Sequence, residues 1–119
     1  MKIALTISEK SENSKVDPRF GRCPYFLIID EETGEKKIID NTQNLNAMQG
    51  AGIQAAQNLL KENPDILITG NIGPKAFTLL SPKVKIYIGA GDLTIEEALN
   101  KYKNGELQLA TGANKPGHW

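Results

Sequence analysis

Short apolar segments separated by polar stretches predict an α/β protein. Lys2–Ile7, Tyr25–Asp30 and Lys36–Asp40 are strand-length and rich in β-branched or aromatic residues. The polar stretch 32–35 between the last two contains a glycine, as a hairpin turn does. These segments predict three strands in an antiparallel meander.

Helical periodicity then alternates with two further strand-like segments. Residues 49–61 carry one apolar stripe at helical spacing. Buried strands are predicted at 66–69 and 84–88. The short segment between them is predicted to be a helix with Pro74 at its first position.

The order of these elements defines the expected topology. Thr94-Ile95-Glu96-Glu97 fits a capping box and predicts a last helix. The order is then β-β-β-α-β-α-β-α, and the last two strands, each reached through a helix, should run parallel. We expect a mixed five-stranded sheet flanked by helices, in one domain over residues 1–110, with a flexible tail over 111–119.

Composition restricts the class of protein. The chain has 119 residues, with 14 basic and 14 acidic side chains, and this balance argues against a nucleic-acid footprint. No apolar run approaches the ~20 residues of a membrane span. The N-terminal apolar segment turns polar at Ser8, too soon for a signal peptide. We expect a cytoplasmic protein that binds neither nucleic acid nor membrane.

A single cysteine, Cys23, and a single histidine, His118, limit the chemistry. One cysteine excludes a disulfide within the chain, and a protein-only metal site normally needs three or four ligands. Any bound metal must therefore be shared, exchangeable or supplied with ligands by something else. His118 is the only imidazole, so no further histidine is available to activate Cys23 as a nucleophile. We therefore expect a protein that is not an enzyme.

The first candidate for binding is the pair Arg19 and Arg22, which flanks Cys23. Nearby positive charge lowers the pKa of a thiol and makes it a better metal ligand, and the guanidinium groups attract anions. The structural alternative is that Phe20 fills the core, Asp17 pairs with an arginine, and Cys23 is a small buried hydrophobe.

The second candidate is a strand-to-helix turn in which Gly70, Gly73 and Lys75 are the proposed binding residues. Backbone N–H groups at a helix start favour anions, and glycine allows close approach. The turn has neither the phosphate-loop nor the dinucleotide spacing, so a structural role stays equally open. Loops after the first, fourth and fifth strands share one edge of the sheet. We therefore expect the Arg19 loop, this turn and residues 89–92 to surround one cleft.

Two further features have structural alternatives. A glycine-spaced entry at 48–53 precedes the first helix, and we favour a packing role for Gly52. His118 lies beside Trp119 near the end of the sequence. A histidine there is usually solvated, and the functional alternative is that it closes over a ligand bound elsewhere.

In four stretches the sequence resembles the dinitrogenase iron–molybdenum cofactor biosynthesis family, the NifX-like group that includes the C-terminal region of NifB. The stretches are RFGRCPYF (19–26), GAGIQAA (50–56), ITGNIGPKAF (68–77) and LTIEEAL (93–99). The resemblance covers residues 2 to about 109. It implies a ribonuclease H-like motif fold and a small non-catalytic carrier or scaffold for an iron–sulfur or iron–molybdenum type metallocluster or its precursor.

In the implied carrier, Arg19 and Arg22 supply charge to an anionic cluster, Cys23 supplies a thiolate, and His118 is a candidate second metal ligand. Iron–sulfur clusters usually take four cysteines, so a partner or a symmetric homodimer would complete the ligands. The expected partners are metallocluster donor or acceptor proteins. The alternative function is a regulatory module that binds a small anion or nucleotide through Arg19 and the turn at Lys75. A nuclease is not expected, because the first strand carries no acidic residue.

Overall fold

The computed structural model describes residues 1–44 and 50–114. Within them the chain forms six strands, three α-helices and one short 3₁₀ helix. In chain order these are β1 Lys2–Ile7, β2 Tyr25–Asp30, β3 Lys36–Asp40, η1 Thr42–Asn44, α1 Ala51–Leu60, β4 Ile66–Ile68, α2 Pro74–Leu80, β5 Lys85–Ile88, α3 Ile95–Lys103 and β6 Gln108–Leu109. No helix in these ranges is long and apolar enough to cross a membrane.

The strands form one mixed sheet in the order β3-β2-β1-β4-β5-β6. The first three strands pair antiparallel, and β1, β4 and β5 pair parallel, as the element order predicts. The expected number of five strands is wrong, because β6 adds an antiparallel pair between Tyr87 and Leu109 and between Ile88 and Gln108. Two exposed residues have no apolar alternation that could reveal a strand in the sequence.

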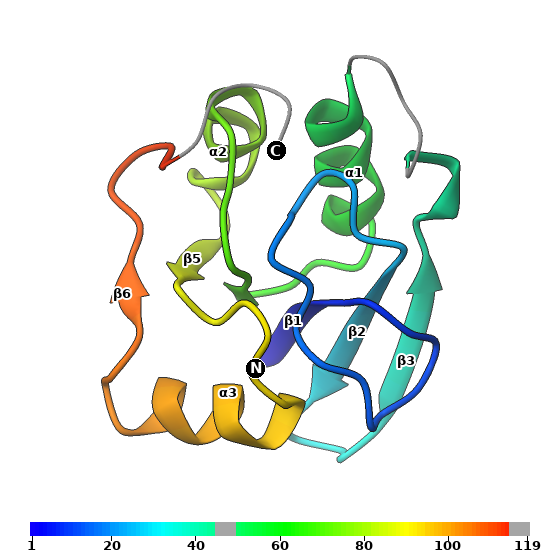
Figure 1. Cartoon of the computed structure of the whole chain (residues 1–119), viewed down its shortest axis with the longest axis vertical. Helices are drawn as coiled ribbons and strands as arrows, with labels where there is room; N and C mark the ends of the chain where they lie inside the picture. Colours follow the sequence, from blue (N-terminus) through cyan, green and yellow to red (C-terminus); the bar gives the residue numbers. More distant parts are fainter. Residues whose placement is uncertain (45–49, 115–119) are drawn as a thin grey trace.

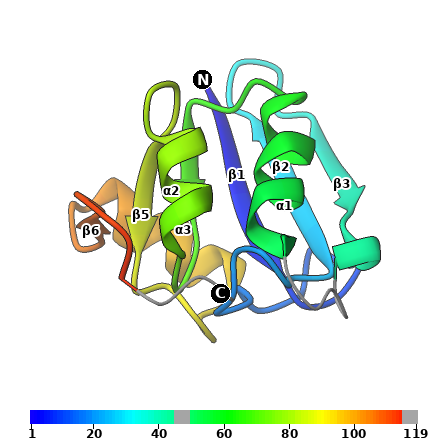
Figure 2. The same ribbon diagram turned by 90° about the horizontal axis from the view of Figure 1, so that it is seen from above.

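The sheet is covered by helices on both faces, with α1 and α2 on one side and α3 on the other (Figures 1 and 2). Alternate residues of β1 therefore enter different cores. Ala4 packs in the cluster with α1 and α2, whereas Ile3 and Leu5 pack in the cluster with α3. Because both faces are buried, the central strands are almost continuously apolar in sequence.

Close packing sets α1 directly beside α2. A Cβ atom on Gly52 would lie 3.4 Å from the Cβ of Ala76, which confirms the packing role of this glycine. Each of these helices runs antiparallel to the parallel strands that it connects, so both helices begin at the carboxyl edge of the sheet. Two helix N-termini thus lie near the loops that follow β1 and β4 (Figure 2).

Pro18, in the loop after β1, is wedged between the loops after β4 and β5. A Cβ on Gly70 would lie 2.6 Å from the Cα of Pro18, and a Cβ on Gly91 would lie 3.0 Å from the Cβ of Pro18. The distance at Gly70 is too short for any side chain larger than hydrogen, and at Gly91 a Cβ would require Pro18 to shift by a few tenths of an ångström. The glycines therefore permit the close approach that joins the three loops.

We predict that Gly70→Ala destabilises the fold by about 1–3 kcal/mol, since the added methyl group must displace the backbone of Pro18. The free energy of unfolding in urea measures this effect. Gly112→Ala is the matched control, because nothing lies within 4 Å of a Cβ there, and its effect should stay within about 0.5 kcal/mol. Equal stabilities of the two variants would contradict the wedge.

Candidate functional site

The loops after β1, β4 and β5 meet at one edge of the sheet, as predicted. Phe20 N donates to the carbonyl of Asn71 at 3.2 Å, and Asn71 Nδ2 donates to the carbonyl of Pro18 at 3.0 Å. Asp92 N donates to the carbonyl of Val16 at 2.9 Å. These contacts hold the Arg19 loop against its neighbours and fix where its side chains emerge.

Asp17 is a buried carboxylate at the base of this edge. It accepts hydrogen bonds from Arg19 N at 2.8 Å, from Arg19 Nε at 3.3 Å and from Ser8 Oγ at 3.0 Å. The alternative in which Asp17 pairs with an arginine is therefore confirmed. Its charge offsets part of the positive charge of Arg19, whose side chain is 39% exposed.

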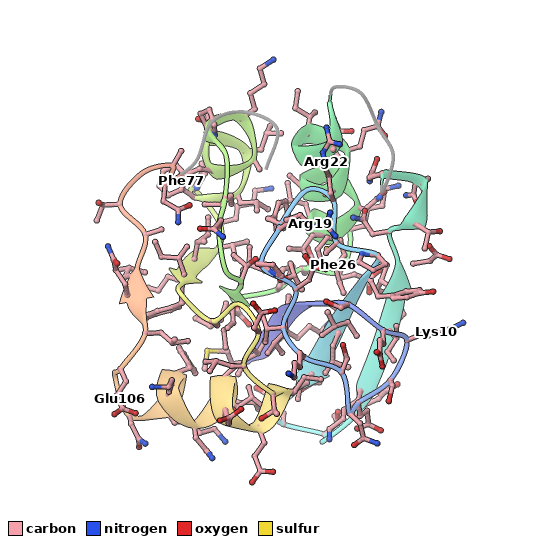
Figure 3. All side chains as sticks on the ribbon, viewed as in Figure 1. Lys10, Arg19, Arg22, Phe26, Phe77 and Glu106 are labelled. Carbon is pink, nitrogen blue, oxygen red and sulfur yellow. The ribbon has the colours of Figure 1, made fainter. Side chains whose placement is uncertain are left out.

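Arg22 has no carboxylate partner among the described residues. Its Nε atom is buried and has no hydrogen-bond partner within residues 1–44 and 50–114. Arg22 and Arg19 lie on the same side of the molecule, with Arg22 in front of α1 in this view (Figure 3). Buried polar groups are nearly always hydrogen-bonded, so a buried unsatisfied cationic donor suits an anionic ligand.

The adjacent helix starts also lack negative charge. Gly50, with φ of 80°, caps α1, and Gly73 caps α2; neither has a side-chain cap, and neither helix has an acidic residue in its first turn. In contrast, α3 has the predicted capping box, in which Glu97 N donates to Thr94 Oγ1 at 3.1 Å. Lys75 is exposed in the first turn of α2. These two helix starts therefore carry partial positive charge, whereas the same edge also holds the carboxylates of Asp17 and Asp92.

Cys23 does not have the reactive character that its neighbours predict. The side chain is fully buried, its thiol donates to the carbonyl of Phe20 at 3.2 Å, and both residues lie in the core with α1. Burial, aided by the charge of Asp17, raises the pKa of the thiol well above its ordinary value, although Asn41 and Arg19 lower it. The expectation of a depressed pKa is wrong, because desolvation outweighs the nearby guanidinium.

Of the other residues predicted for the site, only some lie at the carboxyl edge with space for a ligand. Gly73 and Lys75 lie at the edge, whereas the space beside Gly70 is filled by Pro18. His118 lies outside the described residues. Within residues 1–44 and 50–114, no three His, Cys, Asp or Glu side chains are grouped so that they could hold a metal ion.

Two asparagines support the edge and were missed in the sequence. Asn41 is buried, and its Nδ2 donates to the carbonyl of Cys23 at 2.8 Å and to the carbonyl of Gly21 at 3.3 Å. Asn114 lies within the predicted tail and accepts from Ile72 N at 2.7 Å. The asparagine-rich stretch after β3 was the available signal for the first, since such residues often bond to loop backbone.

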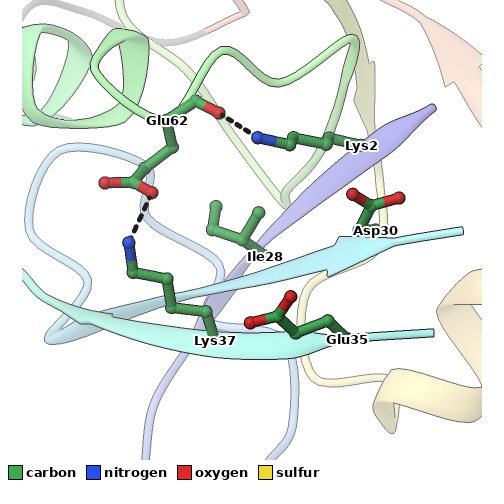
Figure 4. A pocket seen from close by; sticks show the side chains of 6 residues that line it. All are labelled: Lys2, Ile28, Asp30, Glu35, Lys37 and Glu62. Carbon is green, nitrogen blue, oxygen red and sulfur yellow. Dashed lines mark hydrogen bonds and ion pairs between the residues drawn. The ribbon is translucent and has the colours of Figure 1, made fainter. Parts of the chain in front are cut away.

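A hollow lies at the opposite edge, beside the start of β1 (Figure 4). Its lining residues are Lys2, Ile28, Asp30, Glu35, Lys37 and Glu62. Lys37 Nζ donates to Glu62 Oε1 at 3.0 Å, and Lys2 Nζ donates to the Glu62 carbonyl at 3.5 Å. Because its two lysines are engaged and carboxylates surround them, this hollow suits an anion poorly.

The fold and site define a three-layer α/β protein with two arginines and two uncapped helix starts at the carboxyl edge of its sheet. Residues 1–105 match the family described as dinitrogenase iron-molybdenum cofactor, and the chain belongs to that family. It is 35% identical over 111 residues to the uncharacterized protein MJ0580 of Methanocaldococcus jannaschii, covering 91% of this chain and 90% of that protein.

Solved structures support the same relationship. The apo form of the orange protein from Desulfovibrio gigas superposes with a TM-score of 0.89 at 36% identity, covering 96% of each chain. A Thermotoga protein provisionally assigned as a NifB protein gives a TM-score of 0.80 at 33% identity, covering 98% of each chain. The resemblance that the four sequence stretches indicated is therefore confirmed.

The raised pKa of Cys23 predicts a loss of stability at alkaline pH. The unfolded thiol loses its proton above about pH 8.5, while the buried thiol keeps it, so this group favours unfolding as pH rises, by up to about 1.4 kcal/mol per pH unit. Urea unfolding at a series of alkaline pH values measures this slope. Cys23→Ala lacks the titration, so the wild-type stability should fall faster than that of the variant. Parallel slopes would contradict a buried neutral thiol.

Proposed function

We propose that this protein carries an anionic metallocluster, of iron–sulfur or iron–molybdenum type, as cargo at the carboxyl edge of its sheet. The observation that carries the proposal is the buried Nε of Arg22, which has no hydrogen-bond partner among the described residues. Its loop lies near the starts of α1 and α2, neither of which has a side-chain cap (Figure 2). Membership of a family described by the iron-molybdenum cofactor supports the class of cargo. The relative from Desulfovibrio gigas is described as an apo form, the state of a protein without its bound group.

Charge, more than coordination, would hold this cargo. The described residues offer no cluster of three metal-binding side chains, whereas Arg22, Lys75 and the N–H groups at the start of α1 offer positive charge. For Cys23 to act as a ligand, its loop must open and its thiol must lose a proton. Cys23 and His118 therefore remain predicted metal ligands of a loaded state.

Loose binding suits a carrier more than a catalyst. We infer that the protein is not an enzyme and that its partners are proteins that donate or accept the cluster. A symmetric homodimer would double the available ligands. We also infer a ribonuclease H-like motif from the strand order β3-β2-β1-β4-β5. Nuclease chemistry is not part of the proposal, because β1 contains no acidic residue to hold metal ions.

We predict that anaerobic reconstitution with iron and sulfide gives a coloured protein whose metal is lost at high salt. Arg22→Gln should weaken retention by roughly tenfold, since a hydrogen bond to a charged group contributes about 1.5–3 kcal/mol. Metal content and visible absorption after gel filtration measure the effect. Lys83→Gln is the matched control, because this exposed lysine lies at the far end of α2. It should retain metal like the wild type.

Three outcomes distinguish the details of the proposal. A colourless wild-type protein with no bound metal would overturn the carrier function. Equal metal retention by Arg22→Gln and Lys83→Gln would show that Arg22 does not help to bind the cluster. An unchanged spectrum in Cys23→Ser would exclude Cys23 as a ligand while leaving the charge-held cargo intact.

The exposed Lys75 at an uncapped helix start also keeps the small-anion module as a second candidate. ATP or inorganic phosphate would then raise the melting temperature by mass action. This rise should disappear in Lys75→Ala. A melting temperature that responds to these anions, in a protein that takes up no iron, would favour the module over the carrier.

A further inference from the structure

The side chain of Asn41 holds the turn that carries Arg22. Asn41 directly follows β3 and is fully buried. Its backbone N–H donates to the carbonyl of Pro24 at 2.8 Å. Its side-chain Nδ2 donates to the carbonyl of Cys23 at 2.8 Å and to that of Gly21 at 3.3 Å. Because Gly21 and Cys23 are the sequence neighbours of Arg22, one amide group holds the backbone on both sides of this arginine.

Both ends of the Asn41 amide are engaged. Carbonyl oxygens only accept hydrogen bonds, so Nδ2, with its two hydrogens, must be the atom that faces Gly21 and Cys23. The Oδ1 atom accepts from Asn44 Nδ2 at 2.7 Å and from Asn58 Nδ2, on α1, at 3.4 Å. The amide cannot rotate without losing hydrogen bonds in the buried interior, where such a loss is costly. Asn41 is therefore a rigid link between the turn and α1.

Arg22 depends on its backbone for the direction of its guanidinium group. Residues 21–24 precede β2 and belong to no helix or strand, so a regular hydrogen-bond ladder does not fix them. The Nε of Arg22 is buried and has no hydrogen-bond partner among the residues that the structure describes. A donor that lacks a hydrogen bond keeps its direction only as far as the backbone that carries it is held. The two hydrogen bonds from Asn41 therefore set where this donor points.

We infer that Asn41 is a positioning residue of the cargo site, which acts through the turn to aim the guanidinium group of Arg22 at the anion. The inference rests on the proposed function, and it adds a residue that does not itself touch the cargo, since Asn41 is fully buried. An asparagine that bonds to loop backbone can also be purely structural. That alternative predicts a loss of stability with no specific effect on Arg22.

Exchange of the Arg22 Nε hydrogen with water, measured by NMR in the metal-free protein, tests the positioning directly. Asn41→Ala should speed this exchange by about tenfold, because the turn then opens more often. Asn41→Asp should act in the same direction, since a carboxyl group supplies at most one hydrogen to the two carbonyls. Val84→Ala is the matched control, because it removes buried packing after the far end of α2 and should leave the exchange unchanged. Equal exchange rates in the Asn41 variants and Val84→Ala would overturn the inference.

Metal retention in single and double variants tests whether Asn41 acts through Arg22. In the wild-type background Arg22→Gln should weaken retention by about tenfold, whereas in the Asn41→Ala background it should change retention by less than about twofold. In the Val84→Ala background the full effect of Arg22→Gln should remain. A full effect in the Asn41→Ala background would overturn the inference. A wild-type protein that takes up no metal would overturn the proposed function instead, and the exchange rates would still decide whether Asn41 positions Arg22.

Discussion

The contact of Pro18 with Gly70 and Gly91 is the constraint on which the carboxyl edge depends. It lets the loop after β1 lie directly on the loops after β4 and β5, with no side chain between them. Buried hydrogen bonds stabilise the same junction. Thr6 Oγ1, on β1, donates to the Asp17 carbonyl at 2.8 Å and lies 2.9 Å from Thr69 Oγ1, which follows β4. The positions of Asp17 and Arg19, which flank Pro18, follow from this junction.

The charge at the edge is organised in two different ways. Arg19 is paired with a buried carboxylate and mainly stabilises its own loop. Arg22 and the uncapped start of α1 have no comparable partner within the described ranges. Arg19 therefore has a structural role, and Arg22 is the candidate for binding a ligand, although the two arginines look equivalent in sequence.

The sequence predicted the fold where periodicity and topology rules act, and it predicted the site only in part. The parallel pairing of β1, β4 and β5 follows from the connecting helices, and this rule also brought three distant loops together. The strand β6 was missed because pairing with β5, and not its own residues, makes it a strand. The pKa of Cys23 was misjudged because depth of burial is a property of the packed core, whereas neighbouring charges are visible in sequence.

The uncapped start of α1 has a consequence for the lifetime of the protein in a cell. With glycine at its N-cap, α1 is less stable by roughly a few tenths of a kcal/mol than it would be with a serine or aspartate cap. Under the proposed function, an anion offsets this loss only while it is bound, so an empty chain opens more often than a loaded one. Proteases act on opened chains. Degradation would then selectively remove empty carriers, and the amount of protein would follow the supply of its cargo.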